Sequence, residues 1–461
     1  MKYFWKLCAI FILLGLTILL GCSKRSERFN EPKTEEKSST EEPKKSNKVS
    51  DTSNIEISKI VFFLENSRSL QGYVNGDTDF KTSLTALAHF PDFDNVEKTF
   101  YFISGRDNNC KVDLIGNNSE TLENGLIPGE YIENYSNLTK MFEIALDSSQ
   151  NNNISILITD GLYDVGESDN PKNALEKEVE KTQEAFRNKL NNKDIETIII
   201  KAYSNFNGRY CYASTSRSET INQQRPYYIF LFGNSKLLNG LSKDSFYKKI
   251  KGFDNIARFQ IIDESKIPFQ ATSLNYLGNF KFDRSVKNKL NDVKPDRNGQ
   301  GFQFSFATNF SSLPYSDSYF ETTDNYSCSD DNYTVTSVTK IKKKVYEITE
   351  FTPTHLITVF TQKSPYCKLK VSLKNVVPIW IDNTNSDDES NIESNTTQTF
   401  GFKFLTNAIS DAYSYKNKEN NITNFTFEIN GNNSSGNSIL ITFFILGILI
   451  FGIILLIKYK S

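Results

Sequence analysis

Residues 59–69 of the 461-residue chain read KIVFFLENSRS, and most of the information about the fold starts here. After Lys59 the run is apolar and partly β-branched, which is typical of a strand buried on both faces of a parallel sheet. A second such run, ISILI at 154–158, precedes Thr159-Asp160-Gly161. Because the carboxyl ends of parallel strands meet at one edge of an open α/β sheet, we expect Glu65 and Asp160 to lie close together.

The polar residues that follow these runs supply only oxygen atoms. Ser67 and Ser69 come just after Glu65, and Thr139 precedes the apolar-periodic stretch KMFEIAL. Two carboxylates and three hydroxyls at one sheet edge would form an all-oxygen set, which suits Mg²⁺ or another hard cation. The alternative is that these side chains only cap the turn and helix that follow, as Ser, Thr and Asp commonly do.

The order Glu-x-Ser-x-Ser, Thr, Thr-Asp-Gly resembles the metal-ion-dependent adhesion site of von Willebrand factor A domains, over about residues 55–262. Ser67, Ser69, Thr139 and Asp160 match that site, whereas Glu65 stands where the family has Asp. The resemblance implies a Rossmann-like α/β fold and a bound Mg²⁺, Mn²⁺ or Ca²⁺. It also implies an open coordination position that accepts an acidic residue of a protein partner.

Glutamate at position 65 keeps the charge and both oxygens of the family's aspartate but reaches one methylene further. Mg²⁺ requires near-ideal octahedral geometry, whereas Ca²⁺ tolerates irregular ligand arrangements. The longer side chain therefore leaves two outcomes open. Glu65 can take the place of a bound water, or it can weaken or abolish the metal site.

Strand-like and helical segments alternate from residue 55 to residue 262. The strand-like runs lie at 57–64, 99–104, 154–160, 196–202 and 227–232, with a weaker one at 257–262. Helical periodicity occurs at 80–89, 138–146 and 174–190. This alternation predicts a mostly parallel sheet flanked by helices. The Asn- and Gly-rich stretch 107–135 is expected to be a long loop beside the metal that contacts a partner.

Residues 263–437 show a different pattern, in which short alternating segments are separated by polar turns. These segments lie at 334–338, 344–349, 355–360, 368–373 and 423–429, and they predict a β-rich, antiparallel domain. Residues 400–415 are an exception, because apolar and aromatic residues recur there at helical spacing. The polar, acidic stretch 383–399 is expected to be an exposed loop.

Residues 1–22 resemble a bacterial lipoprotein signal peptide. Lys2 and Lys6 flank the start of a short apolar stretch, and Leu19-Leu20-Gly21-Cys22 resembles a lipobox, which implies cleavage before Cys22 and a lipid on its sulfur. An uncleaved membrane helix is the alternative. Residues 23–54 are almost free of apolar side chains and rich in Lys, Glu, Ser and Pro, so we expect a disordered tether.

Residues 439–457 are apolar and uncharged, and Lys458 and Lys460 follow them. A helix of this length is about 29 Å long, which matches the hydrocarbon core of a bilayer. Positive flanking residues favour the cytoplasmic side. These features predict a transmembrane helix in the cytoplasmic membrane, with the body of the protein facing the periplasm or the cell exterior.

Two of the six cysteines fall in the signal region, which leaves an even number in a chain expected to be exported. Disulfides are therefore a reasonable expectation. Pairing within domains would join Cys110 to Cys211 and Cys328 to Cys367. Other pairings stay open, as do free buried thiols.

Composition and motifs argue against nucleic-acid binding and against an enzyme. The formal net charge is −2 and no basic patch stands out. His89 and His355 are the only histidines, both in segments expected to be structural, and the HExxH, GxSxG and P-loop motifs are missing. We therefore expect a membrane-tethered protein-binding module with a divalent-metal adhesion site. A metal-free scaffold of a cell-envelope complex is the second hypothesis, and a metal-dependent hydrolase is the third.

Overall fold

A computed structural model describes residues 56–106, 109–134, 136–191, 194–241, 244–262, 267–313, 315, 317–390, 392–417 and 421–431. The expected signal peptide at 1–22, the lipidation site Cys22, the tether at 23–54 and the membrane span at 439–457 lie outside these residues.

The first part of the chain is built on a seven-stranded sheet with the order β3-β2-β1-β4-β6-β5-β7. Its strands are β1 (Lys59–Glu65), β2 (Glu97–Arg106), β3 (Asn109–Gly116), β4 (Asn153–Thr159), β5 (Ile195–Cys211), β6 (Ser218–Asn234) and β7 (Phe253–Gln260). The six strand-like runs of the sequence fall on β1, β2, β4, β5, β6 and β7. The stretch expected to be one long loop, 107–135, instead contains β3 and the helix α4 (Ser119–Gly125).

The prediction of a mostly parallel sheet is wrong. Only the pairs β1–β2 and β1–β4 are parallel, and the other four neighbouring pairs of this sheet are antiparallel. The chain turns back from β5 in a long hairpin, so that β6 lies between β4 and β5. A hydrophobic run indicates that a strand is buried on both faces, but it carries no information about strand direction or neighbours.

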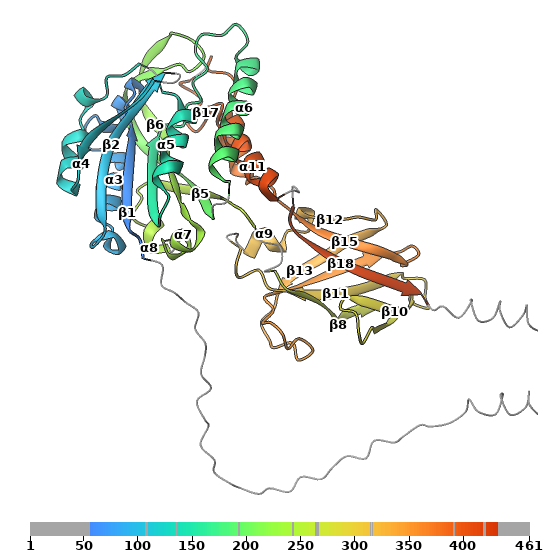
Figure 1. Cartoon of the computed structure of the whole chain (residues 1–461). Coiled ribbons are helices and arrows are strands. Elements are labelled where there is room, and N and C mark those ends of the chain that lie inside the picture. Colours follow the sequence, from blue (N-terminus) through green and yellow to red (C-terminus); the bar gives the residue numbers. More distant parts are fainter. Residues whose placement is uncertain are drawn as a thin grey trace, which may run out of the picture. The chain divides into compact units, whose positions relative to one another are not determined.

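Helices cover both faces of this sheet (Figure 1). On one face lie α5 (Leu138–Ser148), α6 (Pro171–Lys189) and α11 (Phe402–Asn417), and Phe142 of α5 packs on the rings of Phe230 and Phe232. The other face carries α2 (Gln71–Val74), α3 (Asp79–Ala88), α4, α7 (Ser235–Leu241) and α8 (Asp244–Tyr247). There Phe80 of α3 packs on Tyr227, which points away from Phe230 because side chains alternate along a strand.

Polar caps explain where the helices near the sheet edge begin. The Asn137 side chain accepts a hydrogen bond from the Lys140 amide at 3.0 Å at the start of α5. Asn170 does the same for the Asn173 amide at 3.1 Å at the start of α6. Each cap satisfies a backbone N–H that has no partner inside the helix. These caps fix the loops that enter the helices beside β1 and β4.

A segment late in the sequence returns to the first core. It comprises α10 (Ile379–Thr384), the short strands β16 (Asn385–Ser386) and β17 (Thr399–Phe400), and α11. Phe402 stacks on Tyr228 with ring centroids 4.0 Å apart, and Tyr413 packs against Phe186 and Phe259. The helical spacing at 400–415 is confirmed. The sequence assigned this segment to the β-rich domain, but its side chains belong to the α/β core.

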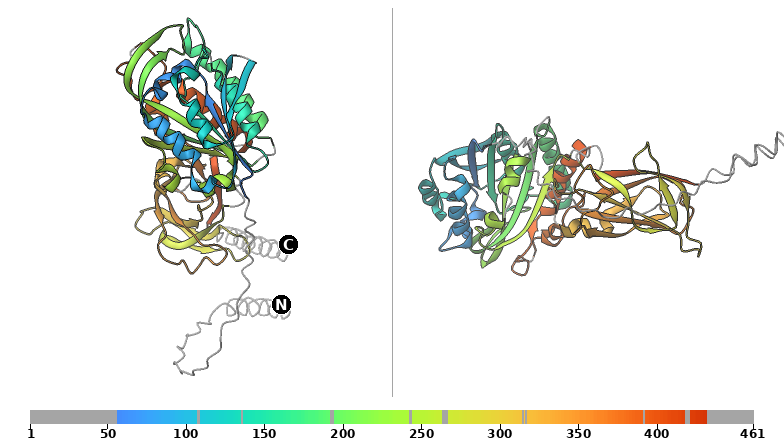
Figure 2. Two further views of the ribbon diagram at one scale, coloured as in Figure 1. Left: turned by 90° about the vertical axis from the view of Figure 1, so that its left-hand side faces the viewer. Right: turned by 90° about the horizontal axis from the view of Figure 1, so that it is seen from below.

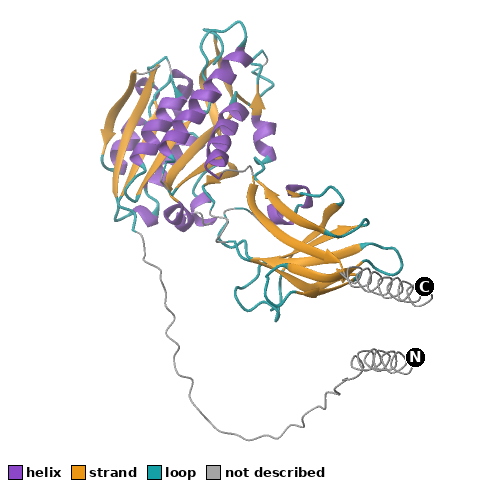
Figure 3. Cartoon of the chain, turned by 45° about the vertical axis from the view of Figure 1, so that its right-hand side comes forward, coloured by secondary structure: helices purple, strands orange, loops and turns teal. Residues whose placement is uncertain are grey.

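A second core lies between two further sheets, which are rich in strands and poor in helices (Figures 2 and 3). The five-stranded sheet has the order β12-β15-β18-β10-β9, and the four-stranded sheet has the order β13-β14-β11-β8. The strands are β8 (Phe269–Leu277), β9 (Asn279–Phe282), β10 (Lys289–Lys294), β11 (Phe302–Thr308), β12 (Tyr326–Cys328), β13 (Tyr333–Lys340), β14 (His355–Thr361), β15 (Cys367–Lys374) and β18 (Asn421–Gly431), with the helix α9 (Asp317–Glu321) between β11 and β12. Phe304 and Phe306 of β11 pack on Phe427 of β18 across the core. The expected segment at 344–349 is not a strand.

The fold prediction also ended in a membrane-spanning helix, and this element is corrected as well. Within the ranges that the structure describes, no helix is long and apolar enough to cross a membrane. Residues 439–457, where the helix was expected, lie outside those ranges.

The cysteines at 110, 211, 328 and 367 are all free thiols, so neither expected disulfide is formed. Each thiol is partly buried. Burial raises the pKa of Cys110 and of Cys328 to about 11, and it also raises the pKa of Cys211 and of Cys367. These thiols are therefore protonated and unreactive at neutral pH.

Candidate metal centre

Glu65 and Asp160 meet at one edge of the seven-stranded sheet. β1 and β4 are parallel neighbours with Leu64 opposite Ile158, so Glu65 comes to lie beside Thr159. The Thr159 hydroxyl donates a hydrogen bond to Glu65 Oε2. Glu65 is completely buried and Asp160 is 5% exposed. Two carboxyl groups thus share a site that is almost closed to solvent.

The turn after β1 adds two hydroxyls to the site. Ser67 has an extended backbone and precedes a short 3₁₀ turn over Arg68–Leu70. The oxygens Ser67 Oγ and Ser69 Oγ are 2.8 Å apart, and both side chains are buried. Neighbouring ligands of a Mg²⁺ ion with bonds of about 2.1 Å lie about 3 Å apart in an octahedral shell. The spacing of the two hydroxyls therefore suits one small cation.

The turn after β4 fixes the second carboxylate. Gly161 has a positive φ of 72°, and a Cβ at this position would lie 2.4 Å from the Tyr228 ring, so only glycine fits. The turn lets the Gly161 amide donate to Thr159 Oγ1 at 2.8 Å. The Leu162 amide donates to Asp160 Oδ1 at 3.1 Å. Asp160 is thereby held in one orientation.

Thr139 does not join this group through a direct contact. Its hydroxyl lies 2.6 Å from Thr182 Oγ1 of α6, which in turn lies 2.5 Å from the Tyr163 hydroxyl. Thr139 thus ties α5 and α6 to the loop that follows Asp160. The structure instead places Ser136, which precedes the cap of α5, within hydrogen-bonding reach of Glu65. Ser136 was missed because the family pattern directed attention to the threonine.

Electrostatics disfavour two negative charges in this site. Burial, together with the charge of Asp160, raises the pKa of Glu65 from 4.5 to about 8. Burial also raises the pKa of Asp160, while hydrogen bonds from Ser69 and from the Leu162 amide oppose that rise. Without a cation the pair therefore retains a proton at neutral pH.

One oxygen of Glu65 has no protein partner. The Thr159 hydroxyl donates to Oε2, and the nearby hydroxyls of Ser67 and Ser136 lower the Glu65 pKa. Oε1 is completely buried and makes no hydrogen bond. A buried carboxylate oxygen without a partner is costly. The atom is available to a ligand that comes from outside the chain.

Arg225 is the positive charge that acts on Asp160. It is buried, and its charge lowers the Asp160 pKa against the effect of burial. Its guanidinium donates to the carbonyl oxygens of Asn395 at 2.7 Å and Gln398 at 3.0 Å. Arg225 therefore also binds the returning segment that was expected to be an exposed loop.

The segment at 131–133, the end of the expected partner-contact loop, packs on the turn after β1. Asn66 accepts a hydrogen bond from the Ile132 amide at 3.0 Å, and Arg68 donates to the Ile132 carbonyl at 3.1 Å. The Ile132 side chain itself is 58% exposed. An exposed apolar residue thus stands beside the candidate site, where a partner could reach it.

The donor set fits a hard divalent cation. It consists of carboxylates from Glu65 and Asp160 and hydroxyls from Ser67, Ser69 and Ser136, all of them oxygen. Across the described residues no group of three or more His, Cys, Asp or Glu side chains could hold a metal. The site thus relies on hydroxyls, which leave more positive charge on the ion than carboxylates would.

Comparison with known proteins adds no further identification. No family model matches the chain, and no curated protein or solved structure is significantly similar to it.

Proposed function

We propose that the α/β part of this chain is a protein-binding module that holds a divalent cation with Glu65, Ser67, Ser69, Ser136 and Asp160. The observation that carries the proposal is the buried, unpartnered Oε1 of Glu65 beside a second carboxylate and three hydroxyls. A cation would supply the missing partner and replace the proton that the carboxyl pair retains.

The resemblance to von Willebrand factor A domains supports this proposal at the level of the motif. Three neutral hydroxyls and two carboxylates would supply five oxygens and would leave one position of a six-coordinate shell open, which an acidic residue of a partner protein would fill. The exposed Ile132 beside the turn offers an apolar contact to that partner. The partner is thus proposed to present a carboxylate next to an apolar side chain.

Thermal unfolding of the EDTA-treated protein tests the metal site. Adding Mg²⁺, Mn²⁺ or Ca²⁺ at about one hundred times the dissociation constant should raise the melting temperature by about 5 °C or more. Asp160→Ala should abolish the rise. Asp147→Ala, which removes an exposed carboxylate paired with Lys189 at the end of α5, is the matched control and should retain it.

A metal-free scaffold is the second candidate, and Arg225 favours it, because a buried guanidinium already acts on Asp160. In that case the metals would not change the melting temperature of the wild-type protein. The amount of partner protein bound would also be the same with and without EDTA. A rise that disappears in Asp160→Ala but persists in Asp147→Ala would exclude this candidate.

We also propose that the chain is lipid-anchored to a membrane at Cys22, because Leu19-Leu20-Gly21-Cys22 resembles a lipobox. In a bacterial host fed an alkyne-bearing fatty acid, the wild-type chain should become labelled. The Cys22→Ala chain should not be labelled. Equal labelling of both would contradict the anchor.

A further inference from the structure

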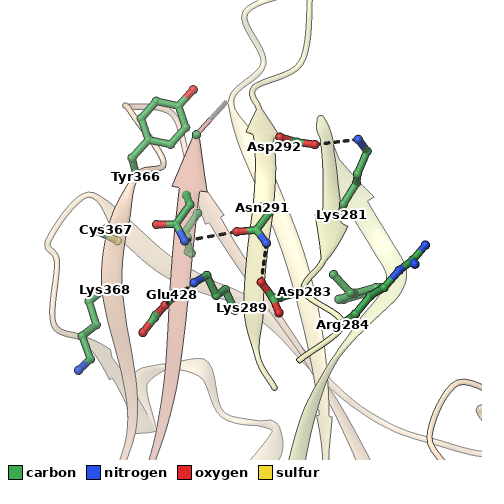
Figure 4. A pocket seen from close by; sticks show the side chains of 14 residues that line it. Lys281, Asp283, Arg284, Lys289, Asn291, Asp292, Tyr366, Cys367, Lys368 and Glu428 are labelled. Atoms are coloured by element: carbon green, nitrogen blue, oxygen red, sulfur yellow. Dashed lines mark hydrogen bonds and ion pairs between the residues drawn. The ribbon is translucent and has the colours of Figure 1, made fainter. Parts of the chain in front are cut away.

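An open cavity of about 1110 Å³ lies on the outer face of the five-stranded sheet, away from the second core (Figure 4). Side chains of β9, β10, β15 and β18 line it, together with the turn after β9. Lys368 and Glu428 face each other across β15 and β18, and Lys289 flanks Glu428 on β10. The proposed metal centre makes no use of this cavity.

Most charges of this cavity are paired with one another. Lys281 Nζ lies 2.7 Å from Asp292 Oδ2, and Lys289 Nζ lies 3.4 Å from Glu428 Oε2. Arg284 and Lys368 lie on opposite sides of the cavity, so they cannot both contact the same small anion (Figure 4). Paired charges leave little net field to attract an ion. The lining therefore favours an uncharged polar ligand.

A chain of planar polar groups crosses the floor of the cavity. Asn430 Nδ2 donates to Asn291 Oδ1 at 3.4 Å, and Asn291 Nδ2 donates to Asp283 Oδ2 at 2.9 Å. Asp283 Oδ1 is held in turn by the amides of Ser285 and Val286. These bonds orient the groups while each amide and carboxylate keeps spare donor or acceptor positions. Such groups can hydrogen-bond hydroxyls that both donate and accept.

An irregularity in β10 brings extra polar groups to the cavity. The pairing of β10 shifts register on both sides, between Leu290 and Val293 and between Asn291 and Lys294. Asp292 has a positive φ of 54°. Asn291 and Asp292 both line the cavity at this irregularity, and Asp292 reaches Lys281 there.

Tyr366 supplies an aromatic surface at the rim. Its ring lies against Gly431, where a Cβ would be 2.8 Å from the ring carbons, and its hydroxyl donates to the Val293 carbonyl at 3.3 Å. The side chain is still 50% exposed. The ring is thus held on one side and open to solvent on the other. A fixed, half-exposed ring can stack on the apolar C–H face of a flat ligand.

We propose that this cavity binds an uncharged saccharide chain. Sugar hydroxyls match the oriented amide and carboxylate groups, and the C–H face of a pyranose matches the open side of Tyr366. With four basic and three acidic side chains, the lining carries little net charge, which disfavours an acidic peptide or a nucleic acid. The cavity is open to solvent, so a polymer can extend beyond it, and we take the ligand to be a chain and not an enclosed small molecule.

Calorimetry on the purified full-length chain tests the proposal with neutral hexasaccharides: cellohexaose, chitohexaose, laminarihexaose and mannohexaose. At least one should bind, and its affinity should change little between about 50 and 500 mM salt because the saccharide is uncharged. Tyr366→Ala should weaken binding about ten-fold, and Asn291→Ala should weaken it similarly. Tyr366→Phe keeps the ring and should bind nearly as well as wild type.

Tyr346→Ala is the matched control, because Tyr346 is 82% exposed in the same part of the chain but does not line this cavity. It should bind like wild type. Absence of binding to every neutral hexasaccharide would overturn the proposal. So would binding confined to a polyglutamate peptide or to hexagalacturonate that weakens steeply with salt. Equal loss of binding in Tyr346→Ala and Tyr366→Ala would also contradict it.

Discussion

Position 65 combines a completely buried carboxyl group with an oxygen that has no partner. Folding without a cation therefore either protonates this group or leaves a poorly solvated charge. Because the Glu65 pKa is raised from 4.5 to about 8, its contribution to stability is complete below about pH 4.5. That contribution is lost as the pH rises through about 8.

We expect Glu65→Gln to stabilise the metal-free protein at pH 8 by at least about 1 kcal/mol, since glutamine fills the same space without a charge. The difference should vanish near pH 4.5. Urea unfolding at both pH values measures this. Glu389→Gln is the control: Glu389 is also buried, but its two oxygens accept hydrogen bonds from the Ala213 and Ser214 amides, so losing its charge should destabilise the protein. A Glu65→Gln protein less stable than wild type at pH 8 would contradict the account.

The metal affinity of the protein should depend on pH for the same reason. Protons and the cation compete for the carboxyl pair, so the rise in melting temperature on adding Mn²⁺ should grow between pH 6 and pH 8. A rise of equal size at both pH values would show that the cation binds elsewhere.

Ser136 and Thr139 are expected to differ in their roles. Ser136→Ala should lower metal affinity about ten-fold or more, because its hydroxyl faces Glu65. Thr139→Val should cost about 1 kcal/mol of stability through the lost bond to Thr182 and change metal affinity less. Calorimetric Mn²⁺ titration and urea unfolding of both variants separate the two effects. A larger loss of affinity in Thr139→Val would reverse the assignment.

The sequence predicted that Glu65 and Asp160 lie close together, because each carboxylate stands at the end of a hydrophobic run. This proximity follows from β1 and β4 being parallel neighbours. Ser136 could not be found this way, since it lies in a loop whose path depends on β2 and on the cap of α5. The backbone of Ser136 bridges to Gly105, a contact between positions far apart in the sequence.

At the element scale the long β5–β6 hairpin and the returning segment enclose the site. The outer half of β5 packs against α2, where a Cβ at Gly208 would lie 2.6 Å from Gly72 Cα. Phe206 and Tyr210 are buried and alternate with polar residues on this half. This alternation with a period of two residues could have predicted that β5 continues beyond residue 202. It was not recognised because most residues of this half are polar.

The returning helix α11 should be required for the stability of the α/β part. Phe402 is completely buried against Tyr228, so Phe402→Ala should destabilise the protein by about 3–5 kcal/mol. Tyr415→Ala on the same helix is the control, because Tyr415 is 63% exposed and should cost less than about 1 kcal/mol. Urea unfolding measures both, and similar values would mean that α11 contributes little to the core.

Taken together, the described residues form two main cores that are built from interleaved segments of the chain. Local patterns identified strands and helices because burial imposes a period on the sequence. They could not show that residues 379–417 return to the first core after most of the second is made. They also could not show the order of strands in the sheet, because that order depends on contacts distant in sequence.

The protein should need no disulfide for its stability. The thiols at 110, 211, 328 and 367 are free, and burial raises the pKa of each. Dithiothreitol should therefore leave the melting temperature unchanged, and the native thiols should react slowly with a disulfide reagent at pH 8. A lower melting temperature in the reductant would show that a disulfide forms in solution.

The most direct test of the metal centre is anomalous X-ray diffraction from crystals of the protein soaked in Mn²⁺ at pH 8. The account predicts a peak within about 2.5 Å of oxygens from Ser67, Ser69 and Asp160, with Glu65 Oε1 directed toward it. The same soak of Asp160→Ala crystals should give no peak there. Wild-type crystals without a peak at this position, with Glu65 unchanged, would contradict the central claim that the site holds a cation.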